Sequence, residues 1–363
     1  PPFRTARRSA FGMTRRSCRS AANDPGLAAV FGARTPVVTL VGKTWDYHAE
    51  VALGVSLDEN LAMIADSVAE AARRGEAMFD AEHFFDGYKR NRDYALAAIT
   101  AAHKAGARWI VLCDTNGGAL PHEVEAIVAE VAKSIPGEQL GFHGHDDTGN
   151  GVANTLAAVR AGVRQVQGTI NGIGERCGNA NLISIVPTLM LKPAFAERFS
   201  TGISRANLAG IARLSHAFDE LLNRAPEPQA PYVGASAFAT KAGIHASALL
   251  KEPQTYEHVP PEAVGNSRKV MVSDQGGKSN FIAELKRRGI AVARDDPRLD
   301  TLIALVKEHE AQGYAYEGAD ASFELLARRT LGTVPVFIDV DSFRCMVERR
   351  HDANGNLRTV SEA

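Results

Sequence analysis

The sequence predicts an α/β fold built on a parallel sheet, closed as a barrel of the (β/α)8 kind but short of two strands. From residue 36 onward, short β-branched runs alternate with Ala-rich amphipathic stretches. The runs recur about every 30 residues, the length of a βαβ unit, which makes consecutive strands parallel. Polar residues follow several different runs, as in a barrel whose active site is assembled from many strand ends. A doubly wound open sheet is the alternative. Its active site would lie at one switch point, the place where the strand order reverses.

Six runs are predicted as strands, and the stretches between them as helices. The strands are expected at 9–13, 37–41, 77–80, 109–113, 140–143 and 165–169, and the helices at 57–74, 92–105, 121–134 and 151–161. In the third helix, Val124, Ile127, Val128 and Val131 recur at helical spacing while charged residues occupy other faces. The polar residues at the strand ends are Glu82, Asp114, Thr115, His143, His145 and Asn171.

The pattern changes after residue 193. Helices are predicted at 205–222, 279–288, 300–312 and 319–331, with a Pro-rich linker at 225–231. A last strand is predicted at 334–340, and the end of the chain from Asp352 is polar and lacks a core partner.

The composition limits the classes of partner and compartment. The formal net charge of the 363 residues is −1, so nothing in it favours nucleic acid or an anionic membrane. No apolar run approaches the roughly 18–20 residues that span a bilayer, and the four cysteines are scattered. We therefore expect a soluble cytoplasmic protein with free thiols. The basic, Ser-containing start could also be a transit peptide.

Residues 140–150 carry the most informative pattern, Leu-Gly-Phe-His-Gly-His-Asp-Asp-Thr-Gly-Asn. His143 and His145 stand at i and i+2 of a predicted strand, so both imidazoles project from one face. At a strand end they could bind one divalent metal ion, with Asp146 or Asp147 orienting a ring. A polar loop with incidental histidines is the alternative.

The segment 140–153 resembles a signature of the isopropylmalate, homocitrate and citramalate synthases, a family of barrel metal enzymes related to the hydroxymethylglutaryl-CoA lyases. Residues 171–179, Asn-Gly-Ile-Gly-Glu-Arg-Cys-Gly-Asn, resemble the next block of that family. Its glycines alone could suggest a nucleotide loop, but the internal Glu-Arg pair and the lack of a later ribose-binding acid argue against one. The segments 10–16, 40–46, 79–88, 241–245 and 256–258 are similar to the citramalate branch.

This resemblance implies an acyltransferase. It would condense acetyl-CoA with a 2-oxo acid, pyruvate in the citramalate branch, and hydrolyse the thioester on a route towards isoleucine. A divalent cation (Mn²⁺, Mg²⁺, Zn²⁺ or Co²⁺) would polarise the ketone. A base must remove a proton from the weakly acidic methyl group of acetyl-CoA. Hydrogen-bond donors must hold the carboxylate of the 2-oxo acid. The resemblance also implies a homodimer.

The resemblance assigns ligands for the metal and the substrate. His143 and His145 are implied as metal ligands, with Asn179 near the metal. Thr115 is implied to hold the substrate carboxylate, and capping of the following turn is its alternative role.

Three residues are implied to be catalytic. Glu82 would lie near the acetyl group, although it could be a solvated loop acid. His245 and Tyr256 would assist the base and contact acetyl-CoA, in the same subunit or in the partner's barrel. Their alternatives are a packed core histidine and an interface tyrosine.

The sequence departs from the family at one important point. The family's first strand carries an Arg-Asp-Gly motif, which supplies a catalytic arginine and an aspartate ligand. No such triplet precedes Ala10, where the chain already resembles strand three. We therefore expect a (β/α)8 TIM barrel lacking its first two βα units at 1–193, mostly helical linker subdomains at 194–312, and the truncated start of a C-terminal regulatory domain at 313–363. A chain without the motif is expected to be inactive.

Other functions remain as alternatives. Isopropylmalate or homocitrate synthase would differ only in the 2-oxo acid. A lyase fits less well, because the segment after residue 193 resembles the linker of the synthases. A non-catalytic fragment or scaffold relative is the alternative from another class, and an open-sheet nucleotide-binding protein is the third.

Overall fold

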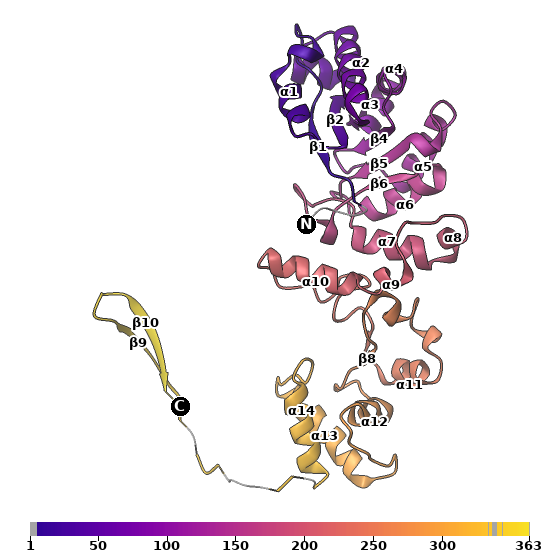
Figure 1. Cartoon of the computed structure of the whole chain (residues 1–363). Coiled ribbons are helices and arrows are strands. Elements are labelled where there is room, and N and C mark those ends of the chain that lie inside the picture. Colours follow the sequence, from indigo (N-terminus) through magenta and orange to yellow (C-terminus); the bar gives the residue numbers. More distant parts are fainter. Residues whose placement is uncertain (1–5, 333, 336–339, 343, 363) are drawn as a thin grey trace. The chain divides into compact units, whose positions relative to one another are not determined.

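The computed structural model describes residues 6–332, 334–335, 340–342 and 344–362 (Figure 1). The chain divides into two compact units, one made of Pro1–Phe238 and Val259–Ser267 and the other of Ala239–His258 and Arg268–Ala363. The domain boundaries predicted at 193 and 312 remain predictions. Most of the strand predicted at 334–340 lies outside the described residues.

The first unit is built on a parallel sheet of six strands. These are β1 (Ser9–Met13), β2 (Val37–Lys43), β3 (Glu76–Glu82), β4 (Trp109–Asp114), β5 (Leu140–Gly144) and β6 (Gln165–Gln167). They pair in the order β1-β2-β3-β4-β5-β6, and every pair is parallel. The order never reverses, so there is no switch point, and the barrel interpretation is confirmed over the doubly wound one.

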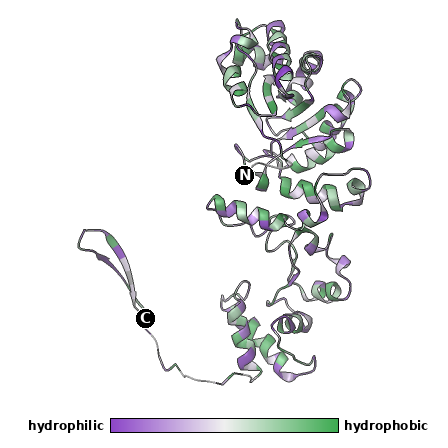
Figure 2. Cartoon of the chain, in the orientation of Figure 1, coloured by the Kyte–Doolittle hydropathy of each residue, from purple (hydrophilic) through white to green (hydrophobic). Residues whose placement is uncertain are grey.

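Helices follow the strands as βαβ connections require. They are α1 (Pro25–Gly32), α2 (Leu57–Arg74), α3 (Phe84–Arg90), α4 (Arg92–Lys104), α5 (Pro121–Val131), α6 (Gly151–Ala161) and α7 (Leu182–Leu191). The α2 helix shows why these segments are helical. Ser56 caps it by accepting a hydrogen bond from the Glu59 amide at 3.2 Å, acids occupy its first turn, and Arg73 and Arg74 its last. Figure 2 shows hydrophilic and hydrophobic residues on most helices, as expected for amphipathic segments.

The core of the first unit lies between the sheet and these helices. Phe79, Leu112 and Phe142 on the strands are fully buried, as are Ile64 and Ile99 on the helices, and they belong to one cluster. The other face of the strands, which lines the barrel interior, carries polar side chains and the candidate site.

The β1 strand stands at one end of the strand order, and β2 is its partner among the strands that the structure describes. Phe11 and Met13 on this strand are 65% and 50% exposed. An apolar edge strand of this kind normally has a covering partner.

The segment after the barrel strands completes the first unit. It contains α8 (Pro193–Ala196), α9 (Arg205–Leu208) and α10 (Ile211–Leu221). The single helical stretch predicted at 205–222 is interrupted, because α9 ends at Leu208 and α10 begins at Ile211. Leu208, Ile211 and Val264 help to form a second apolar cluster here.

The second unit is mostly helical. It contains β7 (Ala239–Thr240), α11 (Gly243–Lys251), β8 (Lys269–Val270), α12 (Lys278–Arg287), α13 (Pro297–Ala311) and α14 (Asp320–Thr330). The last three helices share one core, in which Phe281 and Phe323 meet edge to face at 6.0 Å between ring centroids. No helix in the described ranges is both long enough and apolar enough to cross a membrane.

A hairpin follows near the end of the chain, where the sequence analysis predicted no strand. The β9 strand (Met346–His351) pairs antiparallel with β10 (Leu357–Glu362). The Asp352 carboxylate organises the turn by accepting hydrogen bonds from the amides of Asn354 and Asn356, each at 2.9 Å. The Asn354-Gly355 dipeptide is a hairpin signal that the sequence analysis missed.

Candidate active site at the ends of the barrel strands

The two predicted histidine ligands meet at the end of β5. Their Nε2 atoms lie 3.3 Å apart, and the His145 Nδ1 atom is buried without a hydrogen-bond partner. Burial lowers the pKa of His145, and the nearby His143 and Arg176 lower it further. His145 is therefore neutral at neutral pH, the state that a metal-binding imidazole needs.

Asn179 reaches the same place from the loop that follows β6. Its backbone forms an antiparallel bridge with His145, and its amide nitrogen donates to the Ile173 carbonyl at 3.1 Å. Gly174 leaves the space for this side chain, because a Cβ there would collide with the Asn179 amide nitrogen. The Asn179 Oδ1 atom is buried and has no partner.

These three residues fit a divalent metal ion. Two imidazole nitrogens converge, and a buried amide oxygen lacks the partner that such groups normally have. Nitrogen and oxygen donors of this kind suit Zn²⁺, Mn²⁺ or Co²⁺. The structure thus brings the two predicted histidines together and places the backbone of Asn179 beside His145.

A polar network lies behind the histidine pair in the barrel interior. The His143 Nδ1 atom is 2.8 Å from Gln167 Oε1, and Gln167 donates from Nε2 to Asp80 Oδ1 at 3.0 Å. Asp80 is only 7% exposed, and burial raises the pKa of its carboxyl to about 6 although the Gln167 hydrogen bond lowers it. The sequence analysis did not select Asp80 or Gln167.

Glu82 ends β3 in a second group of titratable side chains. Its carboxylate pairs with the Lys43 ammonium at the end of β2. Ligand atoms of Glu82, His48 and His83 lie within 4.8 Å of one another, so this group could also hold a cation. Such a cation would have to displace the Lys43 ammonium. Among the described residues no ion pair with a lysine occupies the His143–His145 pair, which favours this pair as the candidate metal site.

The histidines of this second group were not predicted. His48 begins the π-helix η2 (His48–Leu53), and its ring stacks on Trp45 at 5.7 Å between centroids. His83 follows β3 with a left-handed φ of 54°, and its Nδ1 atom lies 3.3 Å from the Asp86 carboxylate. A π-turn inside a helix is frequent at functional sites, but no residue pattern in this segment predicted it.

Thr115 lies beside this second group. Its hydroxyl oxygen accepts a hydrogen bond from the His83 amide at 2.8 Å. Its carbonyl accepts from Arg176, whose guanidinium also binds Asp147 with two hydrogen bonds of 2.6 and 2.9 Å. Arg176 thus joins three loops at the strand ends, and it is the partner of the Asp147 carboxylate.

His245 and Tyr256 lie in the second unit and contact each other. Their ring centroids are 4.4 Å apart, and Tyr256 is 47% exposed. His245 is also exposed on α11, so it is not the packed core histidine that the sequence left as an alternative. Both rings are accessible to a ligand.

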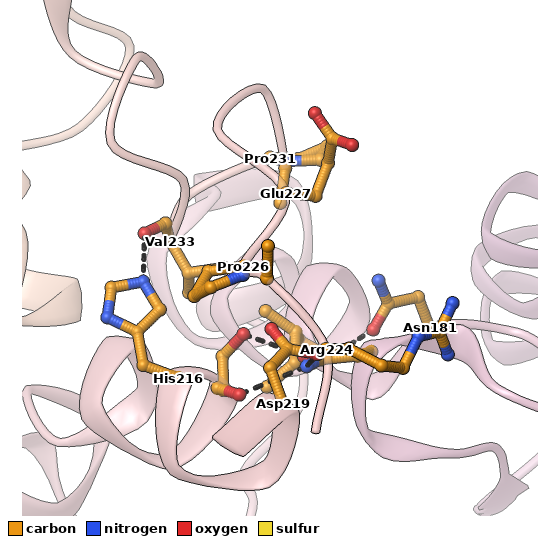
Figure 3. Close-up of a pocket in the computed structure, with 13 residues that line it drawn as sticks. Asn181, His216, Asp219, Arg224, Pro226, Glu227, Pro231 and Val233 are labelled. Carbon is orange, nitrogen blue, oxygen red and sulfur yellow. Dashed lines mark hydrogen bonds between the residues drawn. The ribbon is translucent and has the colours of Figure 1, made fainter. Parts of the chain in front are cut away.

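A separate pocket of about 290 Å³ lies in the first unit, beside α7 and α10 (Figure 3). Asn171, which follows β6 with a φ of 59°, donates to the Ser215 carbonyl and to the Asp219 carboxylate at 3.1 and 2.9 Å. His216 and the Val233 carbonyl are joined by a 3.2 Å hydrogen bond across the same pocket (Figure 3). Asn171 therefore ties α10 to the barrel, and the pocket contains none of the predicted site residues.

Comparison with known proteins gives matches along most of the chain. Residues 11–214 match the HMGL-like family, and residues 232–313 match the family described as homocitrate synthase post-HMGL domain-like. A hydroxymethylglutaryl-CoA lyase from Pseudomonas aeruginosa has a similar fold, with a TM-score of 0.50 and 17% identity over 69% of this chain and 77% of that one.

The curated relatives are longer than this chain. An (R)-citramalate synthase of Aquifex aeolicus is 48% identical over 351 residues, which are 96% of this chain and 66% of the relative. An (R)-citramalate synthase of Streptomyces coelicolor is 46% identical over 361 residues, 99% of this chain and 66% of the relative. A probable 2-isopropylmalate synthase of Methanopyrus kandleri is 34% identical over 80% of this chain and 56% of its own length. Since the HMGL-like match covers more than half of the residues, the chain belongs to the HMGL-like family.

Proposed function

We propose that this chain carries most of the catalytic barrel of a citramalate synthase, which condenses acetyl-CoA with pyruvate and releases CoA. The convergence of His143 and His145, with 3.3 Å between their Nε2 atoms, is the observation that carries the proposal. The unpartnered Oδ1 of Asn179 supports it. The choice of pyruvate is supported by the relatives named (R)-citramalate synthase, which are 44 to 48% identical.

Three residues would hold a divalent cation: His143, His145 and Asn179. Such a cation, when bound, would polarise the ketone of the 2-oxo acid. Thr115 would bind the substrate carboxylate. Its oxygen already accepts from the His83 amide, which leaves the hydroxyl proton free to donate to an anion.

The condensation needs a proton acceptor and a proton donor. A base takes a proton from the methyl carbon of acetyl-CoA, and the resulting carbanion forms a bond to the ketone carbon of pyruvate. The ketone oxygen then takes a proton, and water cleaves the thioester to give citramalate and the CoA thiol. We propose that Glu82, paired with Lys43, lies near the acetyl group. We also propose that the contacting pair His245 and Tyr256 assists the base, in this subunit or in the partner of a homodimer.

We further infer that two more βα units complete the barrel between β6 and β1. Two observations support the inference. The strands β1 and β6 stand at the two ends of the strand order, and Phe11 and Met13 on β1 are exposed. Two further strands there would bury this apolar edge. We therefore expect the 363 residues alone to be inactive.

Thiol release is the measurement that tests the proposed function. The 363-residue chain and a version extended by two upstream βα units would each receive acetyl-CoA and Mn²⁺ or Mg²⁺, with pyruvate, 2-oxoisovalerate or 2-oxoglutarate. Pyruvate-dependent CoA release by the extended protein alone would support both inferences. Release with another oxo acid would indicate isopropylmalate or homocitrate synthase. No release by either protein would favour a non-catalytic relative.

A further inference from the structure

The side chain of Gln167 connects a buried acid to a metal-binding histidine. Gln167 lies on β6, and in the sheet it is the register neighbour of His143 on β5. Its Oε1 is 2.8 Å from His143 Nδ1, and its Nε2 is 3.0 Å from Asp80 Oδ1 on β3. The Nε2 atom also lies 3.3 Å from Met78 Sδ, so the NH₂ end of the amide has two partners and the carbonyl end has one.

The chemistry of these partners fixes the direction of the amide. An ionised carboxylate only accepts hydrogen bonds, so the NH₂ end of Gln167 faces Asp80. The carbonyl end then faces His143, and because it also only accepts, the His143 Nδ1 atom carries the proton. The His143 Nε2 atom consequently keeps its lone pair, and this is the atom that faces His145.

Gly141 on β5 leaves space in the barrel interior for the other glutamine of β6, Gln165. Gly141 precedes His143 by two residues on the same face of β5, and a Cβ there would meet Val111 at 2.9 Å and collide with Gln165. The missing side chain leaves room for the side chain of Gln165. Gln165 lies on the same face as Gln167, and its Nε2 is 3.9 Å from Met78 Sδ, the atom that Gln167 also approaches. Its Oε1, unlike that of Gln167, is buried without a hydrogen-bond partner.

We propose that Asp80 and Gln167 are positioning residues that hold His143 in its Nδ1–H tautomer, with Nε2 directed at a divalent metal ion. The proposal rests on the metal site of the proposed function. In many metal sites, a ligating histidine donates its other N–H to a carbonyl or carboxylate, and this partner orients the ring. Here the partner is an amide whose own direction is set by a buried acid.

The tautomer can be measured without any metal. Nitrogen-15 NMR of the imidazole in the metal-free chain reports which ring nitrogen of His143 is protonated. We expect the Nδ1–H form in the wild type and a shift towards the Nε2–H form in Gln167→Leu. Gln167→Glu keeps an acceptor opposite His143 and should keep the Nδ1–H form. Predominance of the Nε2–H form in the wild type, or an unchanged tautomer in Gln167→Leu, would overturn the proposal.

Metal affinity gives the second readout, and Gln165→Leu is the matched control. Titration calorimetry with Co²⁺, together with the Co²⁺ absorption spectrum, should show affinity lower by about 10- to 100-fold in Gln167→Leu, the usual effect of removing an outer partner. Gln165→Leu removes a glutamine from the same face of β6. It should change the affinity for Co²⁺ by less than about threefold. Equal weakening in both variants would show a general packing effect and refute the positioning role. Failure of the wild type to bind Co²⁺ would instead refute the metal site, while the NMR result would still decide the tautomer.

Discussion

Gln167 on β6 donates a hydrogen bond to Asp80 on β3 at 3.0 Å, although β4 and β5 lie between these strands in the sheet. Neighbouring strands are spaced about 4.8 Å apart, so three spacings in a flat sheet would separate the two backbones by roughly 14 Å. A glutamine and an aspartate side chain cannot bridge that distance. The hydrogen bond therefore requires the six strands to curve around a common interior, as they do in a barrel.

The buried carboxyl of Asp80 predicts an unusual dependence of stability on pH. Burial raises its pKa from 3.8 to about 6 in the folded state. Between these two values the folded chain holds a proton that the unfolded chain has lost, so this group's contribution to stability falls as pH rises from about 4 to 6. The loss is on the order of 2 to 3 kcal/mol.

Comparison with Asp80→Asn isolates this contribution, because asparagine has the same shape and does not titrate. Urea unfolding of both proteins at pH 4.5 and at pH 7.5, in the presence of a chelator, would give the free energies of unfolding. Asp80→Asn should gain stability relative to the wild type as pH rises. If the difference between the two proteins were the same at both pH values, the raised pKa would be refuted.

The two groups of histidines predict different responses to metal. His143→Ala removes one of the two converging nitrogens. It should weaken Mn²⁺ or Zn²⁺ binding by more than about 10- to 100-fold, which is the typical effect of removing a residue that only hydrogen-bonds to a metal ligand. His48→Ala removes a ring from the second group, where Lys43 already neutralises Glu82, and should leave affinity nearly unchanged. Equilibrium dialysis measures both. The reverse ranking would place the metal at His48, Glu82 and His83.

Arg176 is predicted to order the loops at the strand ends rather than to stabilise the fold. Its side chain is 43% exposed and joins Asp147 to the Thr115 carbonyl. A partly exposed pair contributes at most about 1 kcal/mol, so Arg176→Met should leave global stability almost unchanged. Hydrogen exchange should rise in residues 171–179. Arg160→Met, which removes another exposed pair with Glu125, is the control and should leave exchange in that loop unchanged.

Much of the barrel could be predicted from the sequence because its signals are local. The helix α2 was predicted with the bounds that it has, Leu57–Arg74, since its cap, its acidic first turn and its basic last turn are adjacent in sequence. His143 and His145 could also be found, because alternation along one strand puts both rings on one face.

The remaining site residues depend on contacts that a single sequence does not encode locally. The contact between Asp80 and Gln167 follows from barrel curvature, which brings the side chains of β6 and β3 together. His48 and His83 meet, at 4.3 Å between ring centroids, because one begins a π-helix and the other has a left-handed backbone. Neither conformation has a reliable sequence signal.

The interior position of Gly141 predicts that even a methyl group is harmful there. In Gly141→Ala the new Cβ would collide with the Gln165 side chain and lie 2.9 Å from Val111 Cγ2. Overpacking of this kind costs about 1 to 3 kcal/mol. Gly118→Ala is the control, since a Cβ at Gly118 would meet nothing within 4 Å. It should be neutral or slightly stabilising, because alanine restricts the unfolded chain.

A double substitution identifies the origin of the strain. If Gln165 causes most of it, Gln165→Ala should cost less stability in the Gly141→Ala background than in the wild type, because the two effects share one space. Thermal unfolding of the four proteins gives this coupling. Strictly additive changes would mean that Val111 or the backbone absorbs the methyl group. Gln165 would then not be the side chain that limits what fits at position 141.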